Sequence, residues 1–181
     1  MTGERAILVL DDDPDVALAA RFALAELAQR VDGATSLDDL ETVLKARSYD
    51  AILLDMNFAA GDSSGRAGLD GLARTRGLDP AVAVVLMTAY GGVALAVEAL
   101  KRGASDFVLK PWKNERLAEA LTAAMALTRS RREAQTHTLD DLERDAIQEA
   151  LTRHGGNISK AAEALGVTRP ALYRKIEKHG L

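Results

Sequence analysis

The sequence predicts an α/β fold in which a doubly wound, five-stranded parallel sheet is followed by a small all-α domain. Hydrophobic residues make up 48% of the 181 residues and charged residues 28%, a composition typical of a globular chain that buries a core. Over the first 112 residues, short continuously apolar segments alternate with amphipathic ones, as in parallel strands that helices cover on both faces. The remaining residues show only helical patterns, and the length allows one to two domains.

Five segments are the expected strands of the sheet. Four are apolar runs, and a further strand is required between the first two helices, where only the more polar residues 29–34 offer room. The apolar runs are residues 6–10, 51–54, 82–87 and 107–109. Right-handed crossovers between successive strands place the connecting helices on both faces of the sheet.

Amphipathic periodicity predicts the helices that connect and follow these strands. The expected helices are residues 16–28, 37–46, 69–76, 93–102 and 114–131. Ser36 begins a capping box, Ser36-Leu-Asp-Asp39, at the start of the second helix. The loop at residues 59–68 is long, and its glycine and serine content indicates flexibility.

A boundary between two domains is expected at residues 132–137, which are polar and have no apolar period. We therefore divide the chain into residues 1–131, this linker and residues 138–181, although the linker could instead continue the preceding helix. The net charge is −4, yet residues 152–181 carry an excess of basic side chains. Such an asymmetry indicates either contact with a polyanion or a solvated basic face.

Three helices are predicted after the linker. Thr138 begins a second capping box and opens a helix over residues 139–154, which Gly155-Gly156 ends. Two shorter helices joined by a tight turn follow. Their expected cap, turn and first-turn residues are Asn157, Gly166, Thr168 and Pro170.

Groups that bind cations or phosphate stand at the carboxyl ends of four expected strands. They are Asp11, Asp12, Asp13, Asp55, Thr88 and Lys110. In a doubly wound sheet these ends meet at one edge, where such folds bind ligands. Clustered carboxylates repel one another unless a cation joins them, and an all-oxygen ligand set is typical of Mg²⁺. A carboxylate there can attack phosphorus to form an acyl phosphate, which a lysine and a hydroxyl would stabilise. The alternative is that the first three acids cap a helix and Asp55 merely ends a strand.

Several function classes are excluded by what the sequence lacks. It has no cysteine, which excludes disulfides, thiolate metal sites and cysteine nucleophiles. No G-x-G-x-x-G motif follows the first strand, which disfavours dinucleotide binding. The first residues lack the apolar segment of a secretory signal, and the longest apolar run, residues 81–87, is too short to cross a bilayer. We therefore expect a cytoplasmic protein with no membrane partner.

Four motifs together resemble the receiver domain of two-component response regulators. They are Leu10-Asp-Asp-Asp-Pro14, Leu54-Asp55-Met-Asn57, Met87-Thr88-Ala89 and Phe107-Val-Leu-Lys110-Pro111. The resemblance covers about residues 5–125 and implies the flavodoxin-like strand order 2-1-3-4-5. It further implies that a partner histidine kinase phosphorylates Asp55 with Mg²⁺ as cofactor.

The resemblance also implies a role for each matching residue. The Mg²⁺ ligands would be Asp11, Asp12, Asp55 and the backbone carbonyl of Asn57. Thr88 and Lys110 would contact the phosphoryl group, and Thr88 would form a switch pair with Phe107. Asp13 would belong to the start of the first helix rather than to the site.

Residues 54–112 resemble the receivers of nitrogen-regulation-type activators. Those proteins usually carry an ATPase between the receiver and the DNA-binding domain. This sequence contains no G-x-x-x-x-G-K-[ST] motif and leaves no room for such a domain between its two parts. We therefore expect no ATP-driven remodelling of RNA polymerase by this chain.

Residues 139–181 resemble a Fis-type helix-turn-helix module. In such motifs the second short helix presents its N-terminal residues to base edges. The expected interior is Ile158, Ala161, Ala162, Leu165, Val167, Leu172 and Ile176. Thr168, Arg169, Tyr173 and Arg174 are left for DNA, with Arg169 placed to donate to guanine. The expected phosphate contacts are Lys160, Lys175 and Lys178.

The helix over residues 139–154 carries an apolar stripe that three short helices cannot enclose. The stripe comprises Leu139, Leu142, Ala146, Ile147, Ala150 and Leu151. Self-pairing is therefore expected, and Fis-type modules dimerise through this region. A homodimer implies a roughly palindromic site on double-stranded DNA.

These features predict a two-component response regulator that controls transcription through phosphorylation, dimerisation and sequence-specific DNA binding. We expect no enzymatic activity beyond self-phosphorylation and self-dephosphorylation at Asp55. One alternative is a protein-interaction regulator whose C-terminal module mainly dimerises. Another is a phosphatase with an Asp55 nucleophile, although Asn57 stands where that class has a second aspartate.

Overall fold

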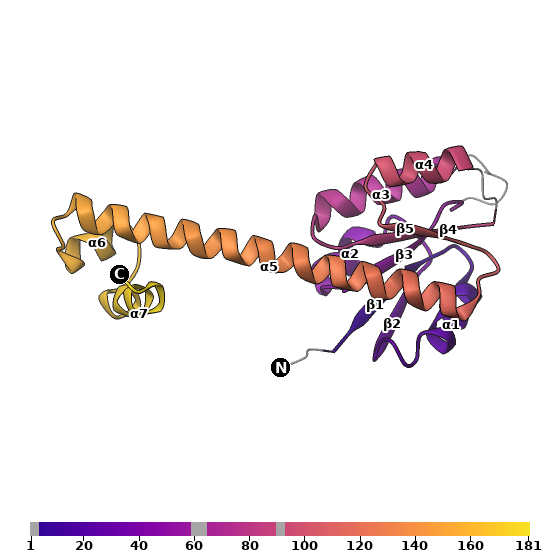
Figure 1. Cartoon of the computed structure of the whole chain (residues 1–181), viewed down its shortest axis with the longest axis horizontal. Coiled ribbons are helices and arrows are strands. Elements are labelled where there is room, and N and C mark those ends of the chain that lie inside the picture. The colour runs from indigo at the N-terminus through magenta and orange to yellow at the C-terminus, as the bar shows by residue number, and fades with distance from the viewer. Residues whose placement is uncertain (1–3, 59–64, 90–92) are drawn as a thin grey trace. The chain divides into compact units, whose positions relative to one another are not determined.

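The computed structural model of the chain describes residues 4–58, 65–89 and 93–181 (Figure 1). Its contacts divide into two compact units, Met1–Arg131 and Arg132–Leu181, which we call the N-terminal unit and the C-terminal unit. The loop predicted to be flexible, residues 59–68, lies largely outside the described residues. Within the described residues, no helix combines the length and the apolar character that crossing a bilayer requires.

The N-terminal unit is built on a five-stranded sheet whose strands are all parallel, in the order β2-β1-β3-β4-β5. The strands are β1 (Ala6–Leu10), β2 (Arg30–Ala34), β3 (Ala51–Asp55), β4 (Val84–Thr88) and β5 (Asp106–Leu109). This confirms the predicted fold class and strand order. Because all strands run in one direction, their carboxyl ends share one edge of the sheet.

Helices cover both faces of this sheet, as predicted (Figure 1). They are α1 (Pro14–Ala23), α2 (Leu40–Ala46), α3 (Arg66–Leu78), α4 (Val93–Lys101) and the first part of α5 (Asn114–Arg153). Alternate β1 side chains enter two separate cores. Leu8 and Leu10 pack with residues of α2, α3 and α4. Ile7 and Val9 pack with residues of α1 and α5.

Several helix and strand ends differ from the predicted ones. α1 ends at Ala23, five residues early, because Leu24 starts a turn in which its carbonyl accepts from both Leu27 N and Ala28 N. α2 begins at Leu40 rather than at residue 37. Ser36 Oγ accepts from Asp38 N at 3.1 Å, so its capping pattern forms a turn ahead of the helix. α3 is longer than predicted, and β4 starts at Val84 rather than at residue 82.

The predicted linker is helical, and α5 continues through it from Asn114 to Arg153. The expected helix start at Thr138 is therefore wrong, and the open alternative of a continued helix is the one observed. Residues 129–138 contain neither glycine nor proline. Most of the side chains in this segment favour helices, and Thr136 Oγ1 donates to the Arg132 carbonyl at 2.9 Å within the helix.

The C-terminal unit packs α6 (Ile158–Ala164) and α7 (Arg169–His179) against the end of α5. Its buried core is Ile147, Ala150, Ala161, Ala162 and Leu172. Both predicted caps are confirmed, since Asn157 Oδ1 accepts from two backbone N–H groups and Thr168 Oγ1 accepts from Ala171 N. Gly166 adopts φ 65° in the turn between the helices, a conformation that favours glycine.

Candidate functional site

Three buried polar side chains gather at the carboxyl edge of the sheet. Asp11 directly follows β1, Asp55 ends β3 and Thr88 ends β4, with exposed fractions of 2%, 3% and 6%. The register brings these strand ends level, since Leu10 pairs with Leu54 and Asp55 pairs with Met87. Burying two carboxylates side by side is unfavourable unless positive charge accompanies them.

Lys110 supplies part of that positive charge. It follows β5, and its backbone N–H donates to the Thr88 carbonyl at 2.8 Å. Its Nζ lies 2.5 Å from Asp11 Oδ2 and 2.9 Å from Asp55 Oδ1. Burial raises the pKa of Asp11 above its usual value, although the hydrogen bond from Lys110 opposes this effect. Burial lowers the pKa of Lys110, but its interactions with Asp11 and Asp55 outweigh burial, and the pKa is raised overall.

The carboxylates also fit a divalent cation. Oxygen atoms of Asp11, Asp12 and Asp55 lie within 4.8 Å of one another, and Asp12 is exposed to solvent. Asp55 Oδ2 accepts from Asn57 N at 2.9 Å, and the buried Asp55 Oδ1 lies beside the Lys110 ammonium, whereas the buried Asn57 Oδ1 has no hydrogen-bond partner among the described residues. A single ammonium does not balance three carboxylates. An incompletely neutralised, all-oxygen set of this kind is the ligand type that Mg²⁺ prefers.

The structure places the other predicted receiver residues near this edge. Asp13 caps α1, with its Oδ1 accepting from Asp15 N at 2.9 Å, so its assignment to the helix start is confirmed. Phe107 lies on β5 opposite Leu86 and is half-buried against the core beneath α4. Its role as a switch partner of Thr88, and that of the Asn57 carbonyl as a ligand, stay predictions.

Sequence reasoning missed a glycine that shapes this edge. Gly68, in the first turn of α3, lies so close to β3 that a Cβ there would sit 2.5 Å from the Met56 Cα. Because the obstacle is backbone, no side-chain movement would relieve it. Gly68 thus lets α3 start directly beside the residue that follows Asp55. Glycines at 65, 68 and 71, spaced three apart, are the sequence signal that could have indicated this close approach.

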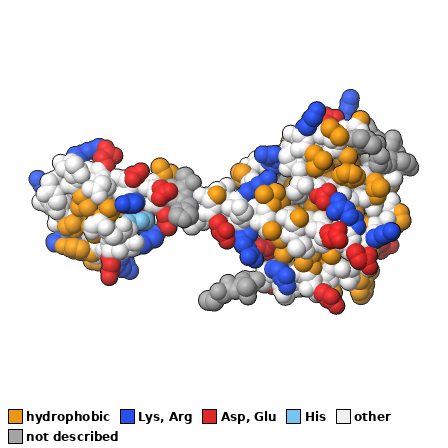
Figure 2. Space-filling model, in the orientation of Figure 1, with side chains coloured by type: hydrophobic (Ala, Val, Ile, Leu, Met, Phe, Trp, Pro, Cys, Tyr) orange, Lys and Arg blue, Asp and Glu red, His pale blue; other side chains and the backbone are white. Residues whose placement is uncertain are grey.

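The C-terminal unit exposes most of the side chains predicted to contact DNA. Thr168, Arg169, Tyr173, Arg174 and Lys160 are all solvent-exposed, and Tyr173 is 52% exposed. Figure 2 shows Lys and Arg side chains, in blue, on several parts of this unit's surface. Two short helices joined at a glycine turn, with the N-terminus of the second one open, are the arrangement that enters the major groove.

Lys175 and Lys178 differ, because both bind carboxylates of α5. Lys175 Nζ donates to Glu143 Oε1, and Lys178 Nζ lies 2.6 Å from Asp140 Oδ1 and 3.4 Å from Glu143 Oε2. His179 Nε2 lies 2.8 Å from Glu143 Oε2. Hydrogen bonds from Lys175 and then from His179 lower the pKa of Glu143 to about 2. Glu143 and Asp140 are residues that the sequence analysis did not single out.

One part of the apolar stripe of α5 is buried, and another part is exposed to solvent. Ile147 and Ala150 are buried in the core of the C-terminal unit. Leu139, Leu142 and Ala146 remain exposed, and the two leucines are 66% and 61% exposed. The three helices therefore leave part of the stripe uncovered, as the sequence analysis expected.

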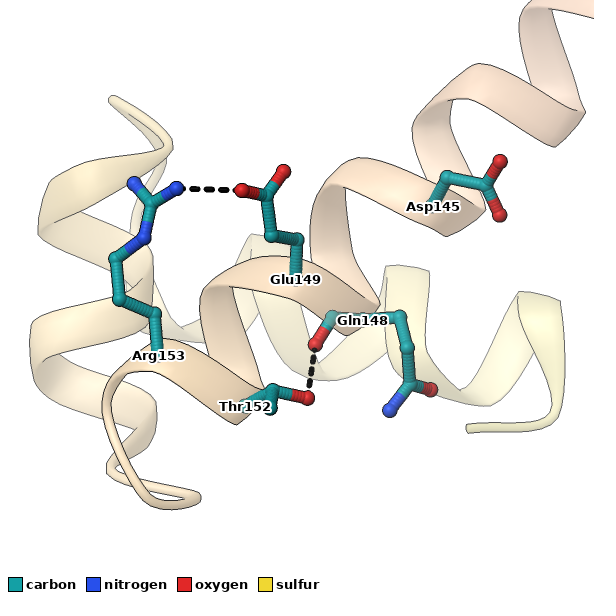
Figure 3. Close-up of a pocket in the computed structure, with 5 residues that line it drawn as sticks. All are labelled: Asp145, Gln148, Glu149, Thr152 and Arg153. Atoms are coloured by element: carbon teal, nitrogen blue, oxygen red, sulfur yellow. Dashed lines mark hydrogen bonds and ion pairs between the residues drawn. The ribbon is translucent and has the colours of Figure 1, made fainter.

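A shallow hollow of about 530 Å³ lies beside the same end of α5 (Figure 3). It is lined by Asp145, Gln148, Glu149, Thr152 and Arg153. Glu149 and Arg153 form an ion pair at 2.5 Å, and Thr152 Oγ1 donates to the Gln148 carbonyl at 2.8 Å. Glu149 and Arg153 neutralise each other, and the Asp145 and Gln148 side chains point away from that pair (Figure 3), so the hollow offers no convergent set of polar groups to a ligand.

Comparisons with known proteins identify two families in the chain. Residues 7–122 match the response regulator receiver domain, and residues 138–179 match the bacterial regulatory protein, Fis family. The transcriptional regulatory protein ZraR of Salmonella typhimurium is 35% identical over 127 residues, which are 70% of this chain and 28% of that protein. The alginate biosynthesis transcriptional regulatory protein AlgB of Pseudomonas putida is 29% identical over 171 residues, 94% of this chain and 33% of that protein. The chain thus spans about a third or less of the length of these curated relatives.

Two examples come from the solved structures that are similar to the chain. The N-terminal receiver domain of a Bacteroides fragilis response regulator is 36% identical with a TM-score of 0.60, and covers 68% of this chain and 98% of that one. A Burkholderia pseudomallei response regulator with a phosphorylated aspartic acid, a calcium ion and citrate is 26% identical with a TM-score of 0.58. That match covers 94% of this chain and 98% of the other. The chain therefore belongs to the response regulator receiver family, and a Fis-family helix-turn-helix domain follows its receiver domain.

Proposed function

We propose that this chain is a phosphorylation-controlled, DNA-binding transcription regulator. A partner histidine kinase donates a phosphoryl group to Asp55, and the modified receiver changes the dimerisation and DNA binding of the C-terminal unit. The observation that carries the proposal is the buried Asp55 carboxylate at the end of β3, whose Oδ1 lies 2.9 Å from the Lys110 ammonium. The exposed helix-turn-helix in the same chain supports DNA binding as the activity that the receiver controls.

Each residue at the sheet edge has a part in the transfer. The Asp55 carboxylate attacks phosphorus, a P–O bond forms, and the P–N bond to the kinase histidine breaks. The Lys110 ammonium, already in contact with Asp55, stabilises the negative charge on the phosphoryl oxygens. Asn57 N–H holds the other Asp55 oxygen and so fixes the carboxylate plane. Asp11, Asp12, Asp55 and the Asn57 carbonyl would hold Mg²⁺, which supplies further charge neutralisation when bound.

The change then passes to the rest of the receiver through Thr88 and Phe107. Thr88 ends β4 beside the site, and Phe107 lies on the neighbouring strand in the core beneath α4. We infer that the Thr88 hydroxyl moves toward the phosphoryl group and that Phe107 turns further inward. A local change in charge would thereby bias an element with two arrangements. The phosphorylated aspartic acid and calcium ion in the Burkholderia pseudomallei regulator support this chemistry by similarity.

Capture of genomic DNA fragments by the full chain tests the proposal. The capture is run at one fixed, near-physiological salt concentration, because non-specific affinity depends steeply on salt. Mg²⁺ and a small phosphodonor are either present or absent, and the Asp55→Asn chain serves as a control. We expect enrichment of a roughly palindromic site, and we expect the donor to change that enrichment for the natural chain only. No enrichment in any condition would favour the alternative, a protein-interaction regulator whose C-terminal module mainly dimerises.

The exposed half of the α5 stripe predicts how two copies pair. Replacing both Leu139 and Leu142 with glutamate places charges on an apolar surface, so the pairing is lost. We expect sedimentation to show a monomer under conditions in which the natural chain is a dimer. Affinity for a duplex with two half-sites falls at least tenfold, whereas affinity for one half-site does not change.

Leu78→Glu is a suitable control for the pairing, since Leu78 is also exposed but lies on α3. That variant keeps the dimer. A natural chain that stays monomeric with and without phosphodonor would rule out pairing through this surface.

A further inference from the structure

We infer that Glu143 and Asp140 compete with DNA phosphates for Lys175 and Lys178. The two carboxylates thereby reduce the number of phosphates that the C-terminal unit contacts. This inference rests on the proposed DNA-binding function and concerns residues that neither the motifs nor the family comparisons assign. It replaces the expectation that both lysines are free phosphate contacts.

The contacts connect two helices that are far apart in sequence. Glu143 accepts from Lys175, which lies 32 residues later, and from Lys178 and His179. Asp140, about one turn before Glu143 on α5, accepts from Lys178 at 2.6 Å. Both carboxylates thus bind the C-terminal half of α7, the second short helix of the helix-turn-helix.

The charges of this cluster cancel. Two ammonium groups face two carboxylates, so one edge of α7 is close to neutral although its sequence is basic. Lys178 lies four residues after Arg174 and therefore on the same side of α7. A phosphate that Arg174 reaches is consequently one that Lys178 would also approach if its carboxylate partners were absent.

The ion pairs are accessible enough to exchange with a phosphate. The Glu143 side chain is 29% exposed, and those of Lys178 and Asp140 are 52% and 47% exposed. An isolated pair at such a surface contributes little net stability, because water and salt screen it, but Glu143 has three partners and these pairs form a network. A DNA phosphate can reach the lysines, but each new phosphate contact requires an existing contact of this network to break.

The other basic residues of the module are in a different situation. For Arg169, Arg174 and Lys160, no ion pair is found among the described residues. These three cations are available to DNA without a competing carboxylate. The cations of the module thus form a free set on α6 and the first half of α7 and a paired set on the second half of α7.

The cluster could also be considered as a metal site, because ligand atoms of Asp140, Glu143 and His179 lie within 4.8 Å of one another. However, the ammonium groups of Lys175 and Lys178 already contact the carboxylates of this group. A cation would have to displace both of them. Competition with phosphate uses the contacts as they stand and needs no additional ion.

The salt dependence of DNA binding tests the inference, because its slope counts the phosphates that a protein neutralises. Each phosphate contributes about 0.9 to the slope of log affinity against log salt concentration. The full chain and its variants are titrated with a short duplex of arbitrary sequence over a range of salt. We expect Glu143→Gln with Asp140→Asn to steepen the slope by about one to two units and to raise affinity several-fold at low salt.

The lysine variants complete a double-mutant cycle. In the natural background, replacing Lys175 and Lys178 with glutamine changes the slope by less than about half a unit, since both lysines are paired. In the Glu143→Gln, Asp140→Asn background, the same replacement returns the slope to its natural value. The replacement of the two lysines in the natural background does not require the Glu143→Gln, Asp140→Asn chain to fold. That measurement therefore tests the inference by itself.

Asp141→Asn with Asp145→Asn is a matched control for charge. These residues also lie on α5 and their replacement removes the same formal charge, but among the described residues the carboxylates that contact Lys175 and Lys178 are those of Glu143 and Asp140. This variant leaves the slope unchanged.

Three outcomes would contradict the inference. The first is a slope that the acid variant does not change, and the second is a loss of about two units when the lysines are replaced in the natural background. The third is a slope that the matched control steepens as much as the Glu143→Gln, Asp140→Asn variant does, which would indicate a general charge effect. If the natural chain bound no DNA at any salt concentration, the proposed function itself would fail.

Discussion

Asp55→Asn removes phosphoryl uptake from a small phosphodonor. The amide that replaces the carboxylate is a poor nucleophile at phosphorus, and the other described carboxylate that contacts Lys110, that of Asp11, belongs to the set that we propose as Mg²⁺ ligands. Uptake is followed by the mass of the intact chain, incubated with Mg²⁺ and acetyl phosphate. We expect a single added phosphoryl group on the natural chain and none on the variant.

The fold should survive this substitution. Asparagine has the shape of aspartate, and its side-chain carbonyl can still accept from Asn57 N. The change also removes one of three neighbouring negative charges, so we expect the thermal stability not to fall. Asp15→Asn, at the exposed start of α1, is the control and keeps full uptake. Undiminished labelling of the Asp55→Asn chain would disprove the assignment of the phosphoacceptor.

The only tryptophan offers a second measurement of the same event. Trp112 lies two residues after Lys110 and packs, partly buried, against the core beneath α1 and α5. A change at Lys110 is therefore close enough to alter its fluorescence. We expect a change on addition of Mg²⁺ and phosphodonor to the natural chain, and none from the phosphodonor in the Asp55→Asn chain.

Arg169→Ala combined with Arg174→Ala lowers affinity for the captured DNA site by about two orders of magnitude, since a good bidentate base contact contributes about 1–3 kcal/mol. Both side chains are exposed on α7 and outside its core, so the fold of the C-terminal unit is retained. Binding is measured at fixed salt with the captured site and with a scrambled duplex. We expect the loss of affinity for the captured site to exceed the loss of affinity for the scrambled duplex, because a base contact carries sequence information.

Arg153→Ala is the control for this second prediction. Arg153 is also exposed, but it lies on α5 and pairs with Glu149. Its removal therefore leaves both affinities nearly unchanged. If the double arginine variant still regulated its target normally in cells, the protein-interaction alternative would be favoured over DNA binding.

The sequence predicted the sheet well where strands are apolar and less well where they are not. Residues 30–34 form β2 although they include Arg30, Asp32 and Gly33, and only the need for a strand between two helices predicted it. Its backbone pairs along its whole length with β1, and a Cβ at Gly33 would lie 2.7 Å from the Ala17 Cβ. This strand is determined by its pairing with β1 and by the close approach of α1. A local sequence pattern contains neither of these contacts.

Helix starts were the least predictable elements, because a capping pattern is local and competes with its surroundings. Ser36 uses its hydroxyl in a turn before α2, and the pattern at Thr138 lies inside α5. By contrast, Asn157 and Thr168 follow glycine-containing turns that stop the preceding helix, and both cap as predicted. A cap is thus predictable where a helix-breaking residue precedes it.

The candidate site at the sheet edge was predictable because its residues occupy equivalent positions. Asp11, Asp55, Thr88 and Lys110 each end or follow a strand, and parallel topology brings strand ends together. The partners of Lys175 and Lys178 were not predictable in this way. Glu143 and Asp140 lie more than 30 residues earlier, and only the packing of α7 on α5 brings them near.

The neutral edge of α7 has a consequence for how such a regulator would find its site in a genome. Competing sequences outnumber a target by many orders of magnitude, so the useful quantity is the ratio of specific to non-specific affinity. Cations that engage any phosphate raise both affinities and lengthen each unproductive encounter. Carboxylates that occupy Lys175 and Lys178 shorten those encounters, while Arg169 remains free to read bases. Sampling of the genome becomes faster, and occupancy becomes more responsive to the number of active copies.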